Sequence, residues 1–438
     1  MKKRKFKRNS CISLICALVL TFNMGALAVD SGSAEIIAAG SEMIGEYPVM
    51  LTSESSLPTT PANAISLSGG YPNYTYTGTL GAGQAGYIKF TATQDMSCSA
   101  YTVSALDTYI EVYSDVACTN AVMVDYDNNS GHALNAMVYF DIDAGSTYYI
   151  KIRGFSNTTS GTYTVRFHRG MPTSGYEKSA MFSLFNSSTY IENTNCYAYA
   201  LGYYVNPITG NMFGFKGIDP GELDGKSAIS MSDLEDPSLA KALIINAVAA
   251  DCEYFDGDIA EIGAEDQPRE GYYKVALFLA PGYDYHWYRE VPNGQWTHKP
   301  SINSARYTDF AGNTIFNPTE SNLEGEYNYT TFLGWFEINT PDVAVSVADI
   351  ANMSNDNVVY PTKFDLTLDD VESIAAGTNY ENVMQLLGEA HGYRGSGKIG
   401  YIYELVDGTE ILVYFRLGVV DQIRKVVDSG YEIIVGET

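Results

Sequence analysis

The sequence predicts a multidomain protein in which an all-β sandwich precedes a mixed α+β unit and a small unit of helices and antiparallel strands. Residues 61–170 contain short runs rich in Val, Ile, Tyr, Phe and Thr, separated by Gly, Asn and Asp, which is typical of a sandwich. Residues 171–340 mix helix and strand patterns, and residues 341–438 place two helix patterns before three strand patterns. A chain of 438 residues is long enough for two to four domains.

The first 28 residues have the pattern of a secretory signal peptide. Six Lys and Arg residues precede an apolar run from Cys11 to Leu27, and the small-residue pattern of a cleavage site ends at Ala28. Residues 29–60, rich in Ser, Gly, Ala, Thr and Pro, are expected to form a flexible lead-in. No later run approaches the roughly 18 apolar residues of a membrane span, so we expect a secreted, extracellular protein.

The charge of the mature chain excludes some partners. Residues 1–28 hold six of the 26 basic residues and none of the 52 acidic ones, so the remainder carries 20 − 52 = −32. Such a charge disfavours binding to nucleic acid or to an anionic membrane surface.

Four cysteines remain after residue 28, namely Cys98, Cys118, Cys196 and Cys252. Cys98 and Cys118 fall in one β-rich segment and can form a disulfide in an oxidising exterior. With no Cys-x-x-Cys and only five histidines, a structural zinc site is not expected. No pattern of catalytic residues accompanies Cys252, which is expected to be structural.

The sandwich segment contains a recognisable set of short stretches. Residues 107–115, 125–131, 144–153 and 161–165 resemble the bacterial pre-peptidase C-terminal domain. This resemblance implies a jelly-roll-like accessory module of secreted hydrolases, with a glycan or protein as its ligand. Asp107, Asp125 and Asp127 are candidate calcium ligands through their oxygens, and Asx turns at strand ends are the alternative.

The middle region, 171–340, has four predicted elements. A short helix begins at Cys196, and a second over 237–250 has one apolar face. The continuous apolar run 272–280 predicts a strand buried on both faces. His286–Val291 and Gln295–His298 flank Pro292-Asn293-Gly294, which predicts a hairpin.

The last region, 341–438, is predicted to contain helices over 368–375 and 380–387, the second ending at Gly388, and strands over 400–405, 409–415 and 420–426. The run 377–388 followed by a Tyr-rich meander resembles the small helix-plus-sheet unit of β-lactamase-inhibitor proteins and small outer-membrane assembly lipoproteins. The resemblance implies a binding module without catalytic residues.

Cys196 and two histidines form the candidate catalytic set. Thr194 or Asn195 can cap the helix that Cys196 opens, and a helix N-terminus favours the thiolate form. A buried structural cysteine is the alternative. If the hairpin loop has three residues, Tyr288 faces His298, and His286 and His298 share one face of the sheet. A two-residue loop places them on opposite faces.

The order of Cys at a helix start, His at a strand start and His on the next strand resembles papain-like peptidases, closest to the NlpC-type cell-wall enzymes. The resemblance implies that Cys196 is the nucleophile, with its backbone N–H as an oxyanion donor. It also implies that His286 is the general base and that His298 orients it. The Asp-Cys-Ser-Gly sequence usual around the nucleophile is absent, and the Cys–His gap is long, which puts peptidoglycan in doubt as the substrate.

Other residues are candidates for supporting roles. Asp309 or Asn303 can replace His298 as the orienting group, and Tyr190 is a candidate second oxyanion donor. Trp287 and Trp296 can wall a substrate cleft or pack in the hairpin core. Arg289 and Lys299 can receive a substrate carboxylate or form surface salt bridges.

These residues favour a secreted cysteine peptidase or amidase that acts through an acyl-thioester on Cys196. The reaction needs no cofactor, and calcium is a candidate ligand of the β-sandwich alone. Its substrate is expected to be a peptide, a protein or a cell-wall peptide. The alternative is a non-catalytic extracellular binding or adhesion protein with a degenerate papain-like scaffold. A transferase that uses the same Cys–His pair with an amine acceptor is a third possibility.

Overall fold

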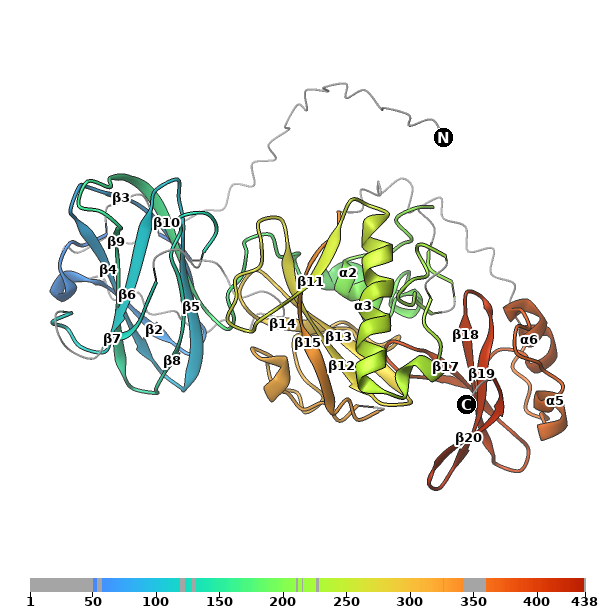
Figure 1. Cartoon of the computed structure of the whole chain (residues 1–438). Helices are drawn as coiled ribbons and strands as arrows, with labels where there is room; N and C mark the ends of the chain where they lie inside the picture. Colours follow the sequence, from blue (N-terminus) through green and yellow to red (C-terminus); the bar gives the residue numbers. More distant parts are fainter. Residues whose placement is uncertain are drawn as a thin grey trace, which may run out of the picture. The chain divides into compact units, whose positions relative to one another are not determined.

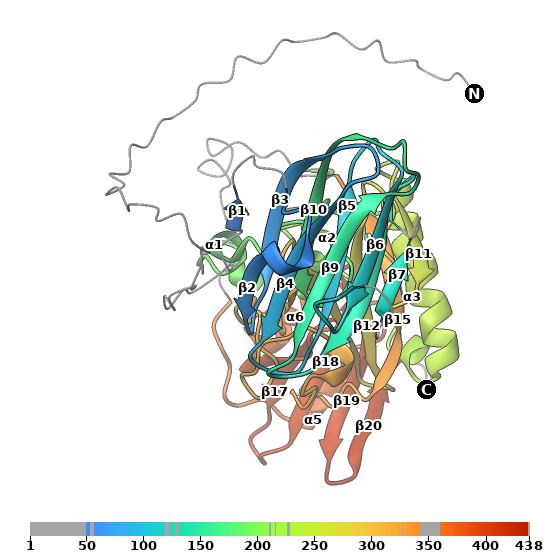
Figure 2. The same cartoon turned by 90° about the vertical axis from the view of Figure 1, so that its left-hand side faces the viewer.

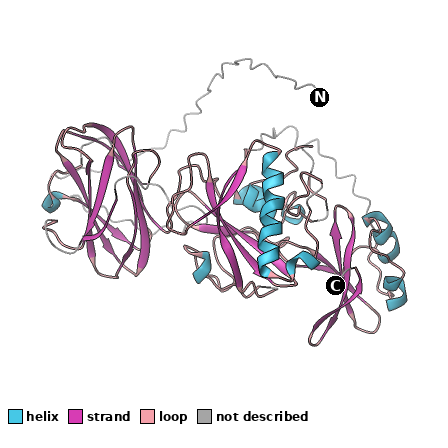
Figure 3. Cartoon of the chain, viewed as in Figure 1, coloured by secondary structure: helices cyan, strands magenta, loops and turns pink. Residues whose placement is uncertain are grey.

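Strands predominate over helices in this protein, for which we obtained a computed structural model (Figure 3). The structure describes residues 50–52, 57–118, 123–127, 131–209, 212–214, 216–225, 228–325, 327–341 and 360–436. The predicted signal peptide, 1–28, lies outside the described residues. Among the helices of the described part of the chain, none combines the length and apolar character needed to cross a membrane.

Two five-stranded sheets form the first unit, as predicted for a β-sandwich (Figure 2). The first sheet has the order β1-β3-β10-β5-β8 and the second β2-β4-β9-β6-β7. The strands are β1 (Met50–Thr52), β2 (Ile65–Gly69), β3 (Asn73–Leu80), β4 (Ala85–Ala92), β5 (Met96–Val103), β6 (Thr108–Tyr113), β7 (Met123–Asp127), β8 (Met137–Ile142), β9 (Thr147–Gly154) and β10 (Gly161–Arg169). Alternate residues of both sheets fill one apolar core between them, as in β9, where half-buried and buried residues alternate along the strand.

Several predictions for this unit need correction. Residues 29–60 are not all a lead-in, because β1 pairs in parallel with β3; of the rest, residues 29–49 and 53–56 lie outside the described residues. Cys98 and Cys118 are both free thiols and belong to different apolar clusters. The structure does not describe the side chains of Asp125 and Asp127, so the calcium site stays a prediction.

The middle unit is built on an antiparallel sheet with the order β11-β15-β12-β13-β14. Its strands are β11 (Asp258–Ile262), β12 (Tyr273–Ala280), β13 (Asp284–Glu290), β14 (Trp296–His298) and β15 (Thr331–Asn339). Every residue of β12 is buried, which confirms the predicted burial on both faces. One face of β12 and β13 packs with α2 (Cys196–Leu201) and α3 (Pro237–Glu253), and Tyr288 and Trp296 pack on the other.

Helix α3 covers the first of these faces (Figure 1). It begins at Pro237 because Asp236 caps its first turn by accepting hydrogen bonds from the backbone N–H groups of Ser238 and Leu239. Ile244 and Val248 are fully buried against the sheet. The helix was predicted over 237–250 and extends to Glu253.

The last unit combines two short helices with a five-stranded meander. The helices are α5 (Leu368–Glu372) and α6 (Tyr380–Leu387), and the strands are β16 (Gly392–Arg394), β17 (Gly400–Glu404), β18 (Glu410–Arg416), β19 (Val419–Val427) and β20 (Gly430–Val435). Val383 and Leu387 of α6 pack on one face of the sheet. Leu412 and Tyr414, from the opposite face of β18, are part of the same core as α2 and α3. The meander therefore has an apolar core on each face.

Candidate active site

Cys196 is the first residue of α2 and is fully buried. Asn195 caps the helix, as predicted, because its side-chain oxygen accepts a hydrogen bond from the backbone N–H of Ala198 at 3.0 Å. The Cys196 sulfur lies 3.9 Å from the carbonyl oxygen of Tyr285, to which it donates a hydrogen bond. The chain fold thus brings the cysteine against the backbone next to His286. The His286 ring itself contacts Tyr288 and Tyr329, which belong to a different apolar cluster from that of Cys196.

The environment of Cys196 keeps it a neutral thiol. Burial raises the pKa of Cys196 well above its usual value, and the nearby Asp284 carboxylate raises it further. These effects exceed the influence of the helix N-terminus, so the expected thiolate is not found in this arrangement.

His286 and His298 lie together, as the three-residue loop predicts. Tyr288 pairs with His298, and Val291 N–H donates a hydrogen bond to Gln295 O across the loop. The register prediction is therefore confirmed. The Nε2 atom of His286 is 2.7 Å from Nδ1 of His298.

The hydrogen bonds of His298 determine where the protons are in this pair. His298 Nε2 lies 2.8 Å from the carbonyl oxygen of Thr308, which can only accept, so Nε2 carries a proton. In a neutral ring, Nδ1 of His298 is then an acceptor, and His286 must donate from Nε2. His286 Nδ1 is left as an unprotonated nitrogen, and no described residue donates to it.

Arg306 does not change this assignment. Its Nε atom lies 3.3 Å from His298 Nε2, but that nitrogen already donates to Thr308 at a shorter distance. We therefore interpret the Arg306 contact as a cation beside the ring, because two donors cannot share a hydrogen bond. Its charge opposes protonation of both histidines.

Both histidines are neutral near pH 7. Burial lowers the pKa of His298 to about 3, and burial together with His298 and Arg306 lowers the pKa of His286 well below its usual value. A folded pKa below the unfolded value of about 6.5 means that stability is present above pH 6.5 and is lost as the pH falls. For His298 this amounts to about 2 kcal/mol between pH 6.5 and 5.

We expect His298→Gln to remove this part of the acid sensitivity. Urea unfolding at pH 7.5 and pH 5 would give the free energy of unfolding of both proteins. Buried Asp284 acts in the opposite direction, since burial raises its pKa to about 7, but it is present in both proteins and cancels in the comparison. An equal pH dependence in the two proteins would show that His298 is not held neutral.

The alternative orienting and oxyanion residues lie in other contacts. The Asp309 carboxylate accepts backbone hydrogen bonds from Ala311, Asn313 and Asn322 and organises that loop. Asn303 lines a hollow beyond His298. Tyr190 packs with Phe185 and Tyr204 in an aromatic cluster separate from that of Cys196. Among the described residues, His298 is the hydrogen-bonded partner of His286.

The proposed cleft residues are in the interior. Trp287 and Trp296 are at most 1% exposed, so their role as cleft walls is wrong in this arrangement and the hairpin-core alternative holds. The Arg289 guanidinium is also buried and donates to the carbonyl oxygens of Tyr199 and Ser179. Lys299 donates to three backbone carbonyls, and burial lowers its pKa to about 7. Neither cation is available to a substrate.

An open hollow of about 420 Å³ lies beside the histidine pair. Phe310, 5.4 Å from the His298 ring, and Arg306 are among the residues that line it. The full lining is Pro300, Ser301, Asn303, Ser304, Arg306, Phe310, Gly325 and Ser396. Both histidines are themselves fully buried and do not line this hollow.

Sequence reasoning missed Asp284 and the segment Gly395–Lys398. The Asp284 carboxylate accepts hydrogen bonds from the backbone N–H groups of Ser396, Gly397 and Lys398 and from the Tyr329 hydroxyl. The closeness of Asp284 to His286 in sequence and the glycines around Ser396 are the available signals. Neither one indicates a contact between residues more than 100 positions apart.

In the described part of the chain, no group of three or more His, Cys, Asp or Glu side chains is placed to hold a metal ion. Cys196, His286 and His298 provide a thiol and two imidazoles.

No family model matches the chain. Over 64 residues it is 39% identical to "Insoluble matrix shell protein 1" of Ruditapes philippinarum, a match that takes in 15% of this chain and 41% of that protein. The chain thus spans about two fifths of the length of this curated relative.

Solved structures that resemble parts of the chain include the pre-peptidase C-terminal domain of a Bacillus anthracis collagenase. That match has 14% identity and a TM-score of 0.19, and it covers 28% of this chain and 98% of that one. Another is PliG of Salmonella Typhimurium, a periplasmic inhibitor of g-type lysozyme. That match has 10% identity and a TM-score of 0.17, and it covers 23% of this chain and 87% of PliG.

Proposed function

We propose that the protein is a secreted cysteine peptidase or amidase with a papain-like middle unit, in which Cys196 is the nucleophile, His286 the general base and His298 the orienting residue. One observation carries the proposal. The His286–His298–Thr308 hydrogen-bond chain leaves His286 Nδ1 as a free proton acceptor, and the residue before His286 contacts the Cys196 sulfur. A thiol and an oriented, unprotonated imidazole are the parts that thiol hydrolysis requires.

The reaction would proceed in two steps. In the first, the Cys196 proton passes to His286, the sulfur bonds to the substrate carbonyl carbon, and the carbon–nitrogen bond breaks as His286 returns the proton to the leaving amine. In the second, water attacks the thioester, gives one proton to His286 and releases the carboxylic acid. The proton then returns to the sulfur, so that the thiol is regenerated.

A trapped acyl group would test the proposal. The full chain would be incubated with a panel of peptides, quenched in acid, digested and examined by mass spectrometry. We expect an acyl adduct on the peptide that contains Cys196 and none on the peptide that contains Cys252, a buried thiol of the same core. Peptide cleavage without any adduct on Cys196, or adducts on both thiols alike, would contradict this mechanism.

A second candidate is a non-catalytic extracellular binding protein with a degenerate papain-like scaffold. The complete burial of Cys196 and its raised pKa favour this alternative. It predicts that no folded variant hydrolyses a peptide, whereas the hydrolase predicts hydrolysis once the thiol is uncovered. In either case, the two flanking units are proposed to bind glycan or protein ligands.

A further inference from the structure

The segment Gly395–Lys398, between β16 and β17, is hydrogen-bonded to the start of α2 at Asn195 and Cys196, and we call it the cover. Ser396 and Lys398 are at most 3% exposed, although they belong to a loop of the last unit. The Ser396 carbonyl oxygen accepts a hydrogen bond from the Cys196 backbone N–H at 3.0 Å. In a cysteine hydrolase that N–H is available to the oxygen of the carbonyl under attack. The loop therefore places a peptide carbonyl where the proposed function requires that of the substrate.

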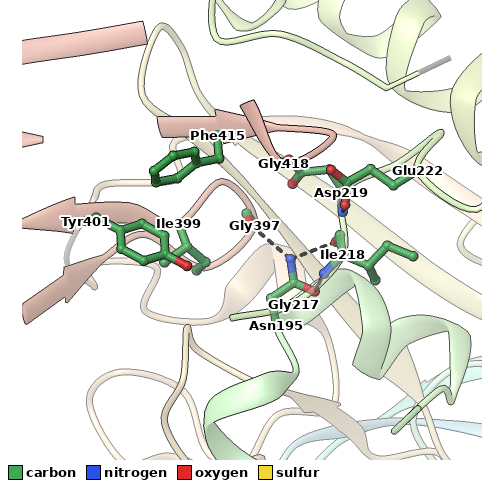
Figure 4. Close-up of a pocket in the computed structure, with 10 residues that line it drawn as sticks. All are labelled: Asn195, Gly217, Ile218, Asp219, Glu222, Gly397, Ile399, Tyr401, Phe415 and Gly418. Carbon is green, nitrogen blue, oxygen red and sulfur yellow. Dashed lines mark hydrogen bonds between the residues drawn. The ribbon is translucent and has the colours of Figure 1, made fainter. Parts of the chain in front are cut away.

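Hydrogen bonds that involve side chains also hold the loop. The Asn195 side-chain amide donates to the Gly397 carbonyl oxygen at 2.9 Å and to the Ile218 carbonyl oxygen at 2.8 Å (Figure 4). On the other side, the Ser301 backbone N–H donates to the Ser396 hydroxyl at 3.1 Å. The loop is thus held from both sides by residues of the middle unit.

Asp284 binds the N–H groups of the same segment. Its carboxylate accepts from the backbone N–H of Ser396 at 2.5 Å and of Lys398 at 2.7 Å, with that of Gly397 at 3.1 Å. These contacts recognise backbone rather than side chains, so any peptide of suitable shape can make them.

Only glycine fits at position 397. A Cβ atom built there would overlap the ring of Tyr285, which is itself fully buried and hydrogen-bonded to Asp219. The ring cannot move without breaking that bond. A peptide in the same place must therefore have glycine directly after the carbonyl that faces Cys196.

The loop lies between two hollows. Ser396 lines the hollow beside Arg306 and Phe310, and Gly397 lines a second one with Asn195, Gly217 and Glu222 (Figure 4). The hollow on the Ser396 side is open and measures about 420 Å³, whereas the one on the Gly397 side measures only about 20 Å³. A longer peptide that follows the course of the loop would therefore extend on the Ser396 side.

We propose that Gly395–Lys398 occupies the substrate's main-chain position, so that the described structure is a self-inhibited state and the preferred substrate is a peptide with glycine after the scissile carbonyl. This inference rests on the proposed function. Displacement of the loop frees the Cys196 N–H and exposes the sulfur. The inhibitor is a segment of the chain itself and dissociates without a covalent change.

Gly397→Ala tests the cover, because the added methyl group overlaps Tyr285 and must displace the loop. We expect iodoacetamide to alkylate Cys196 at least ten-fold faster in this variant than in the wild-type full chain at pH 8. Gly392→Ala, on β16 of the same unit, is the matched control, because its Cβ makes only ordinary contact with Ile402. A folded Gly397→Ala protein that is alkylated at the wild-type rate would overturn the proposal.

A measurement on the wild type keeps the test valid if Gly397→Ala does not fold. In increasing urea, Cys196 should become reactive through local release of the loop, before Cys252, which is in the same apolar core and requires global unfolding. Simultaneous exposure of both thiols at the global transition would contradict a separable cover.

The substrate preference has its own test. Gly397→Ala would be given a peptide with the sequence of residues 393–400 and a second peptide with leucine at the position of Gly397. We expect cleavage of the first between Ser and Gly, at least ten-fold faster than any cleavage of the second. Equal cleavage would overturn the glycine preference. Faster alkylation of Cys196 in Gly397→Ala without peptide hydrolysis would support the proposed cover but would reject the proposed hydrolase.

Discussion

Replacement of Cys196 by alanine should lower the rate of peptide hydrolysis by on the order of 10³-fold or more, because the sulfur forms the bond that replaces the amide. His286→Gln should have a similar effect. Glutamine keeps a polar group near His298 but offers no basic nitrogen, and His286 Nδ1 is the free acceptor of the pair. The rates would be measured with one peptide at saturating and at low concentration, for the full chain and for Gly397→Ala.

The double variant should be no slower than either single variant, since the two residues act on one proton. Cys252→Ala is the control for loss of a buried thiol: it removes a side chain of the same core and should leave the rate unchanged. An active Cys196→Ala or His286→Gln protein would remove that residue from the mechanism, and a slow Cys252→Ala protein would point to damage to the core.

The elements around the site were predictable because they depend on local pattern. The apolar run predicted over 272–280, the hairpin predicted over 286–298 and the helix beginning at Cys196 each have a period or a turn that indicates an element, and all three are present. The pairing of His286 with His298 followed from a three-residue loop, one of the two loop lengths that the sequence left open, and the structure has that register.

The cover over Cys196 was not predictable in this way. Ser396 meets Cys196 through a backbone carbonyl, which any residue type supplies, so the sequence contains no signal for the contact. The pKa of Cys196 was misjudged because the helix N-terminus is visible in the sequence, whereas the burial that dominates comes from a core assembled from several distant parts of the chain. Arg289 and Lys299 were expected near a substrate and instead bind backbone carbonyls in the interior.

Lys398→Met should destabilise the protein by about 3–5 kcal/mol, because it leaves a buried carboxylate without its partner. Lys398 Nζ lies 2.5 Å from Asp219 and 2.7 Å from the Ile229 carbonyl oxygen, and the lysine side chain is 1% exposed. Burial lowers the pKa of Lys398, but Asp219 and the nearby Asp421 more than offset this effect and raise it. The pair therefore exists in the charged form and links the loop to the middle unit.

The stability lost in Lys398→Met should become smaller as the pH falls. Burial already raises the pKa of Asp219, and loss of Lys398 raises it further. Stability lost in the variant is thus regained as the pH falls and Asp219 takes up a proton. Urea unfolding at pH 8 and pH 5 would measure this, and Lys398→Met combined with Asp219→Asn should recover part of the loss at pH 8. Lys241→Met is the control, because it breaks the more exposed pair with Glu261. It should lower the free energy of unfolding by less than about 1 kcal/mol. A similar loss for both lysine variants would mean that Lys398 is not the link between the loop and the middle unit.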